Sequence, residues 1–322
     1  MKKGLFTLAF CALALYAEQS TVRVSKQYGV NYLPLIVIED QKLIEKQAKA
    51  AGLGEVKTEW ITFSSGANGN DALIAGQVDL VSGGVAPFLR LWDKTKGKVK
   101  GLVALDRASY YFNANDPRIK TLRDLKKGDR IAVSAIKSSF QAVLLQMATA
   151  KEFGIENYDK FDSQTVTLKQ PDALLQLISD AKEIAVHVAT EPFNTLEVQS
   201  PSVHPILSSR EIVGDLHTNL MVWTSEDFYV KNPKLAKAVY AAFAEAIDWI
   251  NADKKRAAQL YLRVVKSRES FELIYGIIEN DDLQYAIKPT ENTTLFSDFL
   301  YSVGAIKSKP TSWKELFFEI NH

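Results

Sequence analysis

Short apolar segments alternate with helical segments in the first third of the chain, and this alternation restricts the fold more than any other feature. The sequence predicts strands at Thr21–Gln27, Val56–Phe63, Val78–Val81 and Lys98–Leu105, with a helix after each of the first three. Strands that alternate with helices form a parallel sheet with helices on its faces. Ligands of such sheets bind at the carboxyl ends of the strands. We therefore expect an α/β protein whose functional residues lie at that edge.

The segment Val78–Pro87 shows how a site could form there. It is predicted to be a buried strand at Val78–Val81, a tight turn at Ser82–Val85 and a helix that opens at Ala86–Pro87, where proline fits the first turn. The two glycines of the turn would let the backbone approach a ligand closely. A helix N-terminus offers unpaired N–H groups to an anionic or carbonyl oxygen. A routine strand-to-helix turn explains the same residues, but turns of this kind recur along the chain.

A second block of strands and helices follows a break at Asp116–Pro117. Within it, Ser138 and Gln141 fit a capping box at the start of a helix. Two later apolar strands would return the chain to the first block, and the residues from Asp227 onward are predicted to be helical. The predicted strands of the second block and of the return are Arg130–Ser134, Thr165–Leu168, Ile184–Ala189, Val203–Leu207 and Asn219–Thr224.

The N-terminal residues have the pattern of a secretory signal peptide. Lys2 and Lys3 precede the apolar run Gly4–Tyr16, and the small Ala17 precedes polar residues. This run is shorter than the ~20 residues that span a bilayer, so we predict a leader at residues 1–17 that is cleaved after Ala17. The only cysteine, Cys11, would leave with it. The mature chain is then predicted to be soluble, periplasmic and free of disulfides; a buried N-terminal helix is the alternative.

Composition excludes several classes of function. The chain has 322 residues, enough for two domains, and its 39 basic and 38 acidic residues leave a formal charge of +1. This balance gives no sign of a nucleic-acid partner. The sequence has no H-E-x-x-H, G-x-S-x-G or P-loop motif. His187 lies in an apolar strand and is predicted to be a packed core histidine. We therefore predict no metal, no cofactor and no catalytic residue.

Several short segments, in this order and at this spacing, match a known family over nearly all of the mature chain. They are Asn31–Leu35, Ser64–Gly66, Ala72–Asp79, Ser82–Pro87, Ile119–Leu125, Ile131–Val133, Glu191–Phe193 and Ser312–Phe317. Together they resemble the periplasmic solute-binding proteins of ABC importers, in the group that takes aliphatic sulfonates, nitrate or taurine and includes the thiamine-pyrimidine binders.

The resemblance implies a two-lobed periplasmic binding protein of type II. Two parallel-dominated sheets, each flanked by helices, would be joined by two crossing strands near Arg107–Phe112 and Ser208–Asn219. Residues 18–106 and 211–322 would form lobe one, and residues 107–210 would form lobe two. A ligand that contacts both lobes would stabilise a closed form, which a membrane permease would recognise.

The candidate ligand-binding residues lie at the strand–helix turns and on the crossings. They are Tyr32, Ser64, Ser65, Gly84, Val85, Ser109, Ser138, Ser139, Glu191 and Asn219. The four serines at predicted helix starts could equally be N-caps. Tyr32 could form a pocket wall or lie in the core. Ser109 and Asn219 could donate to the ligand or satisfy the backbone at the hinge.

Glu191 distinguishes between possible ligands. A carboxylate in the cleft would repel nitrate or a simple sulfonate but would pair with an amine, as in taurine. The alternative is a salt bridge outside the pocket.

The predicted function is capture of a small organic or inorganic anion by a monomeric substrate-binding component of an ABC importer, which delivers it to the permease. Three alternatives remain open. The chain could bind a thiamine-precursor pyrimidine or another small organic solute, it could be an enzyme of the thiamine-pyrimidine synthase type on the same fold, or it could pass its ligand signal to a receptor. The export signal and the lack of a cysteine or histidine cluster argue against the enzyme.

Overall fold

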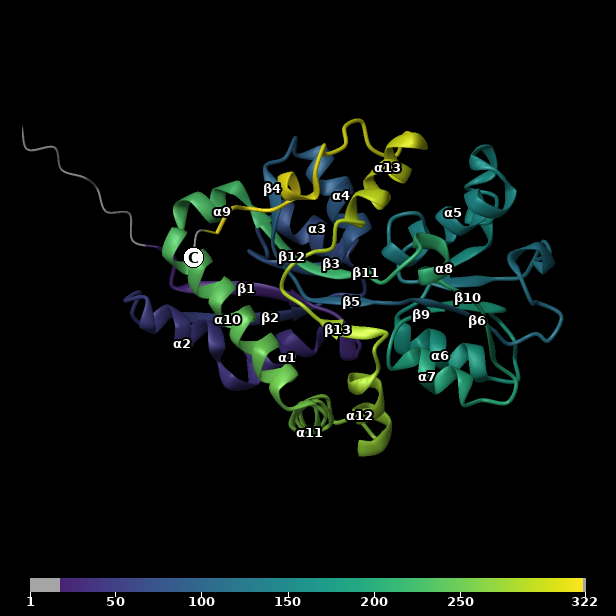
Figure 1. The fold of residues 1–322 in the computed structure, drawn as a ribbon, viewed down its shortest axis with the longest axis horizontal. Helices are drawn as coiled ribbons and strands as arrows, with labels where there is room; N and C mark the ends of the chain where they lie inside the picture. Colours follow the sequence, from purple (N-terminus) through teal and green to yellow (C-terminus); the bar gives the residue numbers. More distant parts are fainter. Residues whose placement is uncertain (1–17, 321–322) are drawn as a thin grey trace, which may run out of the picture.

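The computed structural model describes residues 18–320, which form two layers of strands with helices on their faces and a small three-stranded connection between them (Figure 1). The first layer, which we call one sheet, consists of a two-stranded and a three-stranded sheet joined by an isolated bridge, and the second is a five-stranded sheet. The predicted signal peptide, residues 1–17, lies outside the described residues. We call the first sheet with its helices lobe one, and the second sheet with its helices lobe two.

In the sheet of lobe one, all strands but one run in the same direction. β1 pairs in parallel with β2, and an isolated bridge from Val24 to Leu80 sets the chain entering β3 parallel to β1. β12 lies antiparallel between β3 and β4, so β3 and β4 are parallel to each other. The strands are β1 (Thr21–Lys26), β2 (Lys57–Thr62), β3 (Val81–Gly84), β4 (Val99–Ala104) and β12 (Leu220–Ser225).

The sheet of lobe two has the order β10-β6-β9-β7-β8. β7 is parallel to β8 and β9, and only β6 runs against its neighbours β9 and β10. The strands are β6 (Tyr111–Ala114), β7 (Ile131–Val133), β8 (Thr165–Thr167), β9 (Val186–Ala189) and β10 (His204–Ser208). Both sheets are therefore parallel-dominated, as predicted. β10, however, stays at the edge of lobe two, and only β12 re-enters lobe one.

Three short strands connect the lobes. β5 (Asp106–Ala108) continues from β4 toward β6, and β11 (His217–Thr218) leads back into β12. Both lie within the segments predicted to cross or next to them. A third strand, β13 (Leu283–Tyr285), pairs antiparallel with β5 on the side away from β11. β13 comes from the C-terminal part of the chain, which was predicted to be helical throughout.

Helices cover both sheets, and α10 is the longest of them. Its buried stripe packs against α1 and α2 in the core of lobe one. The helices of lobe one are α1 (Leu33–Gln41), α2 (Leu43–Ala50), α3 (Gly66–Ile74), α4 (Val85–Lys94), α9 (Glu226–Lys231), α10 (Pro233–Ala252), α11 (Lys254–Val265), α12 (Phe271–Glu279) and α13 (Thr293–Ser302). Those of lobe two are α5 (Phe140–Phe153), α6 (Gln170–Ile178), α7 (Phe193–Val198) and α8 (Ser209–Val213).

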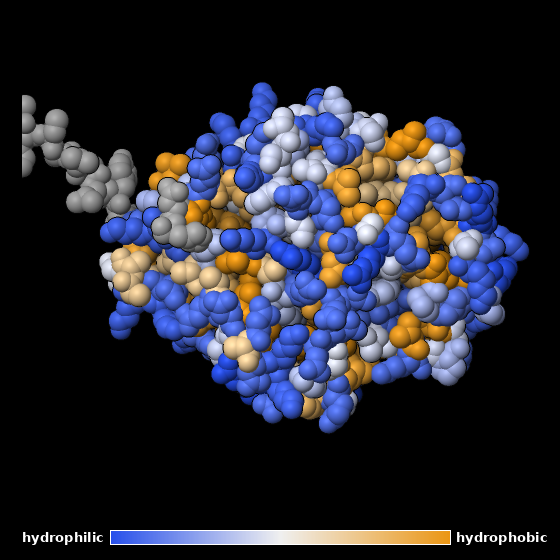
Figure 2. Space-filling model, viewed as in Figure 1, coloured by the Kyte–Doolittle hydropathy of each residue, from blue (hydrophilic) through white to orange (hydrophobic). Residues whose placement is uncertain are grey.

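Hydrophilic residues cover most of the face in Figure 2, and apolar residues appear on it in separate patches. Among the described helices, none has both the length and the apolar character needed to cross a bilayer.

A second apolar core crosses from one lobe to the other. It contains Phe88 of α4 and Phe296 of α13 on one side, and Phe112 of β6 and Phe140 of α5 on the other. The Phe140 ring centroid lies 5.0 Å from that of Phe296 and 5.3 Å from that of Tyr110. The two lobes are thus packed against each other through aromatic side chains.

The prediction for Val78–Pro87 was wrong in its register. β3 begins at Val81 and includes both glycines, and α4 begins at Val85, so the strand lies later than predicted and no turn separates it from the helix. The reason is pairing, because residues 81–84 align with Leu220–Trp223 of β12. Close packing requires a residue without a side chain at position 83, because a Cβ atom on Gly83 would lie 3.0 Å from the Gly66 Cα atom.

Candidate functional site

Helix N-termini from both lobes meet at a narrow cleft. α3 and α4 contribute from lobe one, and α5 and α6 contribute from lobe two. The cavity volume is about 20 Å³, room for roughly one water molecule. The residues that line the cleft are Gln27, Tyr28, Tyr32, Ser64, Gly66, Gly84, Pro87, Tyr110, Ser134, Ser139, Phe140, Gln141, Gln170 and Thr190.

The start of α5 supplies donors from lobe two. Ser139 is its N-cap, since the Ser139 hydroxyl accepts from the Ala142 amide at 3.2 Å. The amides of Phe140 and Gln141 have no hydrogen bond to a described residue. Such first-turn amides lack intrahelical acceptors and carry the positive end of the helix dipole. This end of α5 is therefore suited to an acceptor or an anion.

Gln141 does not belong to the capping box that the sequence predicted. The cap lies at Ser139 and not at Ser138, so Gln141 is one position too early to reach back to it. Its Oε1 atom instead accepts from the Ser134 hydroxyl at 2.7 Å. Gln141 is 4% exposed and lines the cleft. Because Oε1 is engaged, the amide nitrogen is the atom left to bind a ligand.

Lobe one contributes the N-termini of α3 and α4 and the side-chain amide of Gln27. The Ser65 hydroxyl caps α3 by accepting from the Asn68 amide at 3.3 Å. α4 follows Gly84 without any side-chain cap, and the Val85 amide donates to the Asn219 carbonyl at 3.2 Å. Gln27 donates to the Ser82 carbonyl at 2.8 Å, which leaves its own amide oxygen unused.

Tyrosine rings form much of the remaining wall. Tyr32 and Tyr110 are 4% and 5% exposed, and burial raises the pKa of both phenols. Both hydroxyls are therefore protonated at neutral pH and can donate. Tyr28 lies at the mouth of the cleft, where it also borders a wider outer pocket together with Ser64.

Hydroxyl, amide and backbone N–H groups supply the polar chemistry of the cleft. No Asp, Glu, Lys, Arg or His is among its lining residues. Within residues 18–320, no three His, Cys, Asp or Glu side chains come together as a metal ion would require. The arrangement can hold an acceptor-rich group, such as an oxyanion or a carbonyl, by hydrogen bonds and helix dipoles.

A buried carboxylate organises the hinge behind the cleft. Asp106 is 0% exposed and accepts from Asn31 at 2.6 Å, from Asn219 at 3.2 Å and from the Leu220 amide at 2.8 Å. Burial raises the pKa of Asp106 from 3.8 to about 7. Asn31 in turn accepts from the Thr190 hydroxyl of lobe two at 2.8 Å. This chain of hydrogen bonds connects the two lobes through β5.

The cleft brings together only some of the predicted ligand-binding residues. Tyr32, Ser64, Gly84 and Ser139 line it. Ser65 and Val85 lie at the helix starts behind it, and Asn219 lies in the hinge, where its Oδ1 atom has no partner among the described residues. Ser138 borders a separate pocket between α3 and α4, beside Arg90. Ser109 and Glu191 line a separate pocket.

Glu191 caps a helix. Its carboxylate accepts from Asn194 at 2.9 Å, from the Thr195 amide at 3.2 Å and from the Thr195 hydroxyl at 2.8 Å. These groups lie in the first turn of α7. Burial raises the pKa of the Glu191 carboxyl. Glu191 forms no ion pair with a described residue and does not reach the cleft.

His187 is buried, as predicted, and its Nδ1 atom contacts the Glu197 carboxylate, which also accepts from Asn113 at 2.8 Å. This group lies in lobe two outside the cleft.

Ten of the fourteen lining residues were not predicted from the sequence, among them Gln27, Tyr110, Gln141, Gln170 and Thr190. At two positions the predicted residue was the sequence neighbour of the lining residue. Ser109 was named in place of Tyr110, and Glu191 in place of Thr190. Successive residues of an extended chain point to opposite faces. The alternation along the crossing segment therefore indicates that one of two neighbouring residues faces the cleft. Which of the two it is depends on the register of strand pairing, which the sequence does not show.

Comparisons with known proteins agree with this architecture. The model of the NMT1-like family matches residues 16–264. The alkanesulfonate-binding protein SsuA from Xanthomonas axonopodis pv. citri bound to MOPS has a TM-score of 0.73 and 16% identity, with 93% of this chain and 98% of that chain covered. No protein of curated function matches the sequence.

Two further structures are similar over most of their length. The periplasmic aliphatic sulphonate binding protein SsuA from Escherichia coli has a TM-score of 0.67 at 19% identity, covering 94% of this chain and 93% of that one. The periplasmic nitrate-binding protein NrtA from Synechocystis PCC 6803 has a TM-score of 0.67 at 15% identity, covering 92% and 84%. The predicted family and fold are thereby confirmed. The chain belongs to the NMT1-like family and has the two-lobed α/β fold of periplasmic binding proteins.

Proposed function

We propose that this chain is the periplasmic substrate-binding component of an ABC importer. It captures a small organic or inorganic anion between its lobes and delivers the anion to a membrane permease. The observation that carries the proposal is the convergence of α3, α4 and α5 on one cleft with free donors and no carboxylate. Helix N-termini and neutral donors suit an oxyanion. We assign residues 1–17 to a cleaved signal peptide, 18–106 and 211–322 to lobe one, and 107–210 to lobe two, except that the end of α8 at residues 211–213 stays with lobe two, because α8 packs on α5 and β10.

Capture by hinge closure follows from the size of the cleft. Its volume of about 20 Å³ is too small for a polyatomic anion, so a ligand enters only when the lobes part. A ligand that bonds to both lobes would then favour the closed form. The solved structures with this fold include proteins named for alkanesulfonate and nitrate. Both anions carry three acceptor oxygens on one central atom, which matches a cleft of converging donors.

A second ligand class has its own support. Tyr28, Tyr32, Tyr110 and Phe140 place four aromatic rings around the cleft, and no cationic side chain lines it. A flat, uncharged ring with acceptor atoms, such as a thiamine-precursor pyrimidine, could stack on these rings and accept from Gln141. The same lining favours binding over catalysis, because hydroxyl and amide groups are poor general acids and bases near neutral pH.

A thermal-shift screen of the mature chain tests the proposal. The panel contains sulfonates, taurine, nitrate, bicarbonate, aromatic acids and pyrimidines. An anion of the right shape should raise the melting temperature by selective binding to the closed form. If no anion changes the melting temperature and a pyrimidine raises it, the cleft binds a flat, uncharged ring and not an anion. Recovery of the ligand as a chemically altered product would reject a purely binding role.

Delivery to a permease and a monomeric state are parts of the same proposal. Addition of the loaded chain to the reconstituted permease should stimulate its ATPase, and light scattering should give the mass of one mature chain.

A further inference from the structure

A larger pocket lies on the other face of the hinge segment from the cleft. Ser109 and Tyr111 line this pocket, whereas Tyr110, between them, lines the cleft. Asn31 and Glu191 line it too, next to Tyr32 and Thr190 of the cleft. Its volume is about 500 Å³, so it can hold an organic molecule without rearrangement. We call it the back pocket.

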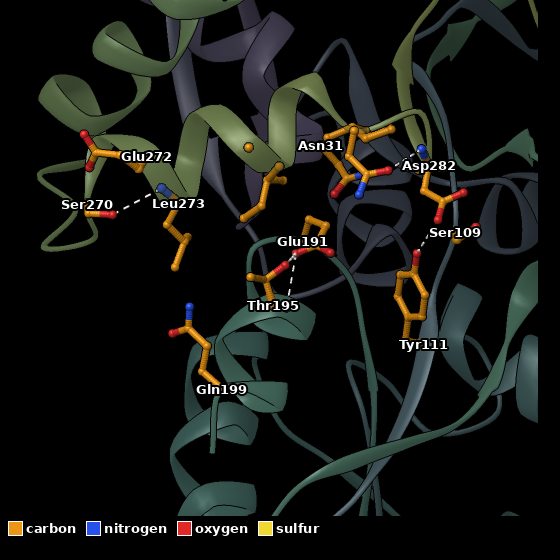
Figure 3. A pocket seen from close by; sticks show the side chains of 15 residues that line it. Asn31, Ser109, Tyr111, Glu191, Thr195, Gln199, Ser270, Glu272, Leu273 and Asp282 are labelled. Carbon is orange, nitrogen blue, oxygen red and sulfur yellow. Dashed lines mark hydrogen bonds between the residues drawn. The ribbon is translucent and has the colours of Figure 1, made fainter. Parts of the chain in front are cut away.

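The two lobes supply opposite walls of the back pocket. α7 of lobe two contributes Thr195 and Gln199, and α12 of lobe one contributes Glu272, Leu273 and other residues of its first turns. In Figure 3, Glu272 and Gln199 lie toward one end, Tyr111 and Asp282 lie toward the other, and Glu191 lies between them.

The lining combines negative charge with an apolar surface. Glu191, Glu272 and Asp282 are its charged residues, and no Lys, Arg or His lines it. The apolar part of the wall comprises Ala108, Leu273, Ile277 and Leu283. A well-formed pocket with an apolar wall and a few convergent polar groups is a place to expect a ligand.

The three carboxylates differ in what they already bind. Asp282 accepts from Arg210 at 2.6 Å and from the Tyr111 hydroxyl at 3.1 Å. Glu191 caps α7 and is half-buried. Glu272 is exposed, and no described residue forms an ion pair with it. Negative charge therefore lies at both ends and in the middle of the pocket, and only the Asp282 end has a cation beside it.

We propose that the back pocket binds an aliphatic diamine, with one ammonium group at the Glu272 carboxylate, the other at the Glu191 carboxylate, and its methylene groups on Leu273 and Ile277. This inference goes beyond the anion binding proposed for the cleft, and it uses different residues. A diamine fits best because its two charges can lie at separated carboxylates while its apolar middle covers the wall. A dianion of the same length is excluded by repulsion from the same carboxylates.

Isothermal titration of the full mature chain with 1,5-diaminopentane tests the inference, with pentanedioate as the probe of equal length and opposite charge. The diamine should bind saturably and the dianion should not. The variant Glu272→Gln removes an exposed charge without disturbing the fold, and it should weaken diamine binding roughly three- to tenfold. Glu55→Gln, which removes an exposed carboxylate outside both pockets, should leave diamine binding unchanged.

Several results would overturn the inference: no saturable diamine binding, equal binding of the two probes, or equal diamine affinities of Glu272→Gln and the natural chain. The cleft is tested separately by its anion panel. If the diamine binds and no anion raises the melting temperature, the back pocket stands and the anion binding proposed for the cleft is in error. If an anion raises the melting temperature and the diamine does not bind, only the proposal for the back pocket is rejected.

Discussion

Gly84 at the start of α4 lies directly against Phe140 at the start of α5. A Cβ atom built on Gly84 would be 2.5 Å from the Cβ atom and 2.9 Å from the Cγ atom of Phe140. Real Cβ atoms essentially never come this close to a neighbour. The backbone of Gly84, with φ −71° and ψ 157°, is one that any residue adopts. The glycine is therefore required by contact between the lobes and not by backbone conformation.

Gly84→Ala should hold the lobes apart. The added methyl group meets the Phe140 side chain, so either the aromatic cluster shifts or the cleft opens. We expect the free energy of unfolding to fall by about 1–3 kcal/mol and the affinity for the cleft ligand to fall at least tenfold. Small-angle scattering should show an increased radius of gyration, because the closed form is the one disfavoured.

Gly276→Ala is the matched control for this substitution. Gly276 lies in α12, and nothing is within 4 Å of a Cβ atom added there. Alanine favours a helix over glycine by about 1 kcal/mol, so this variant should keep or gain stability. If Gly84→Ala leaves both the radius of gyration and the affinity for the cleft ligand unchanged, the close contact between Gly84 and Phe140 is not needed for closure of the lobes.

Gln141→Leu should remove a donor from the cleft. Hydrogen bonds to charged groups contribute about 1.5–3 kcal/mol, so affinity for an anion should fall roughly 10- to 100-fold. The change also leaves the Ser134 hydroxyl without its acceptor. The double variant Ser134→Ala/Gln141→Leu removes both groups and should recover stability without recovering affinity.

Gln284→Leu provides the comparison, because Gln284 is exposed in β13 and lies outside the cleft. Its ligand affinity should equal that of the natural chain when both are measured by titration calorimetry. Equal affinities of Gln141→Leu and the natural chain would remove Gln141 from the site.

The sequence predicted the architecture because hydrophobic periodicity determines which segments are strands and helices, and alternation of the two determines a parallel sheet. It could not determine register. Gly83 and Gly84 were interpreted as a turn, since glycine in a sequence signals conformational freedom. In the structure, Gly83 instead makes room for Gly66 within lobe one, and Gly84 makes room for Phe140 of lobe two. Such contacts join residues far apart in the chain. The same limit explains why Ser109 was chosen over Tyr110, and why Gln141 was assigned to a cap.

Asp106→Asn should change how stability depends on pH. Burial raises the pKa of Asp106 from 3.8 to about 7, so the folded chain binds a proton that the unfolded chain has lost. The stabilisation from this group is fully present below pH 3.8 and is lost as the pH rises through about 7. Its loss amounts to at most about 1.4 kcal/mol per pH unit. The variant cannot ionise at this position, so this component of the slope should disappear.

Urea unfolding at several pH values between 4 and 8 measures the effect. His217 titrates with the opposite sign, because burial lowers its pKa from 6.5 to about 4 and its contribution is lost on acidification. The natural chain should therefore show partly offsetting trends, and Asp106→Asn should lose stability more steeply toward low pH. A difference between the two proteins that stays constant with pH would contradict a buried carboxyl of raised pKa.

Glu191→Ala separates a structural role from a role in the cleft. The Glu191 carboxylate accepts from the Thr195 amide and hydroxyl at the start of α7. Loss of a helix cap costs about 1 kcal/mol, and we expect that decrease in the free energy of unfolding. Because Glu191 lines the back pocket and not the cleft, the affinity for the cleft ligand should change by less than twofold. A selective loss of an amine-bearing cleft ligand such as taurine, with stability unchanged, would instead place this carboxylate in the cleft of the ligand-bound form.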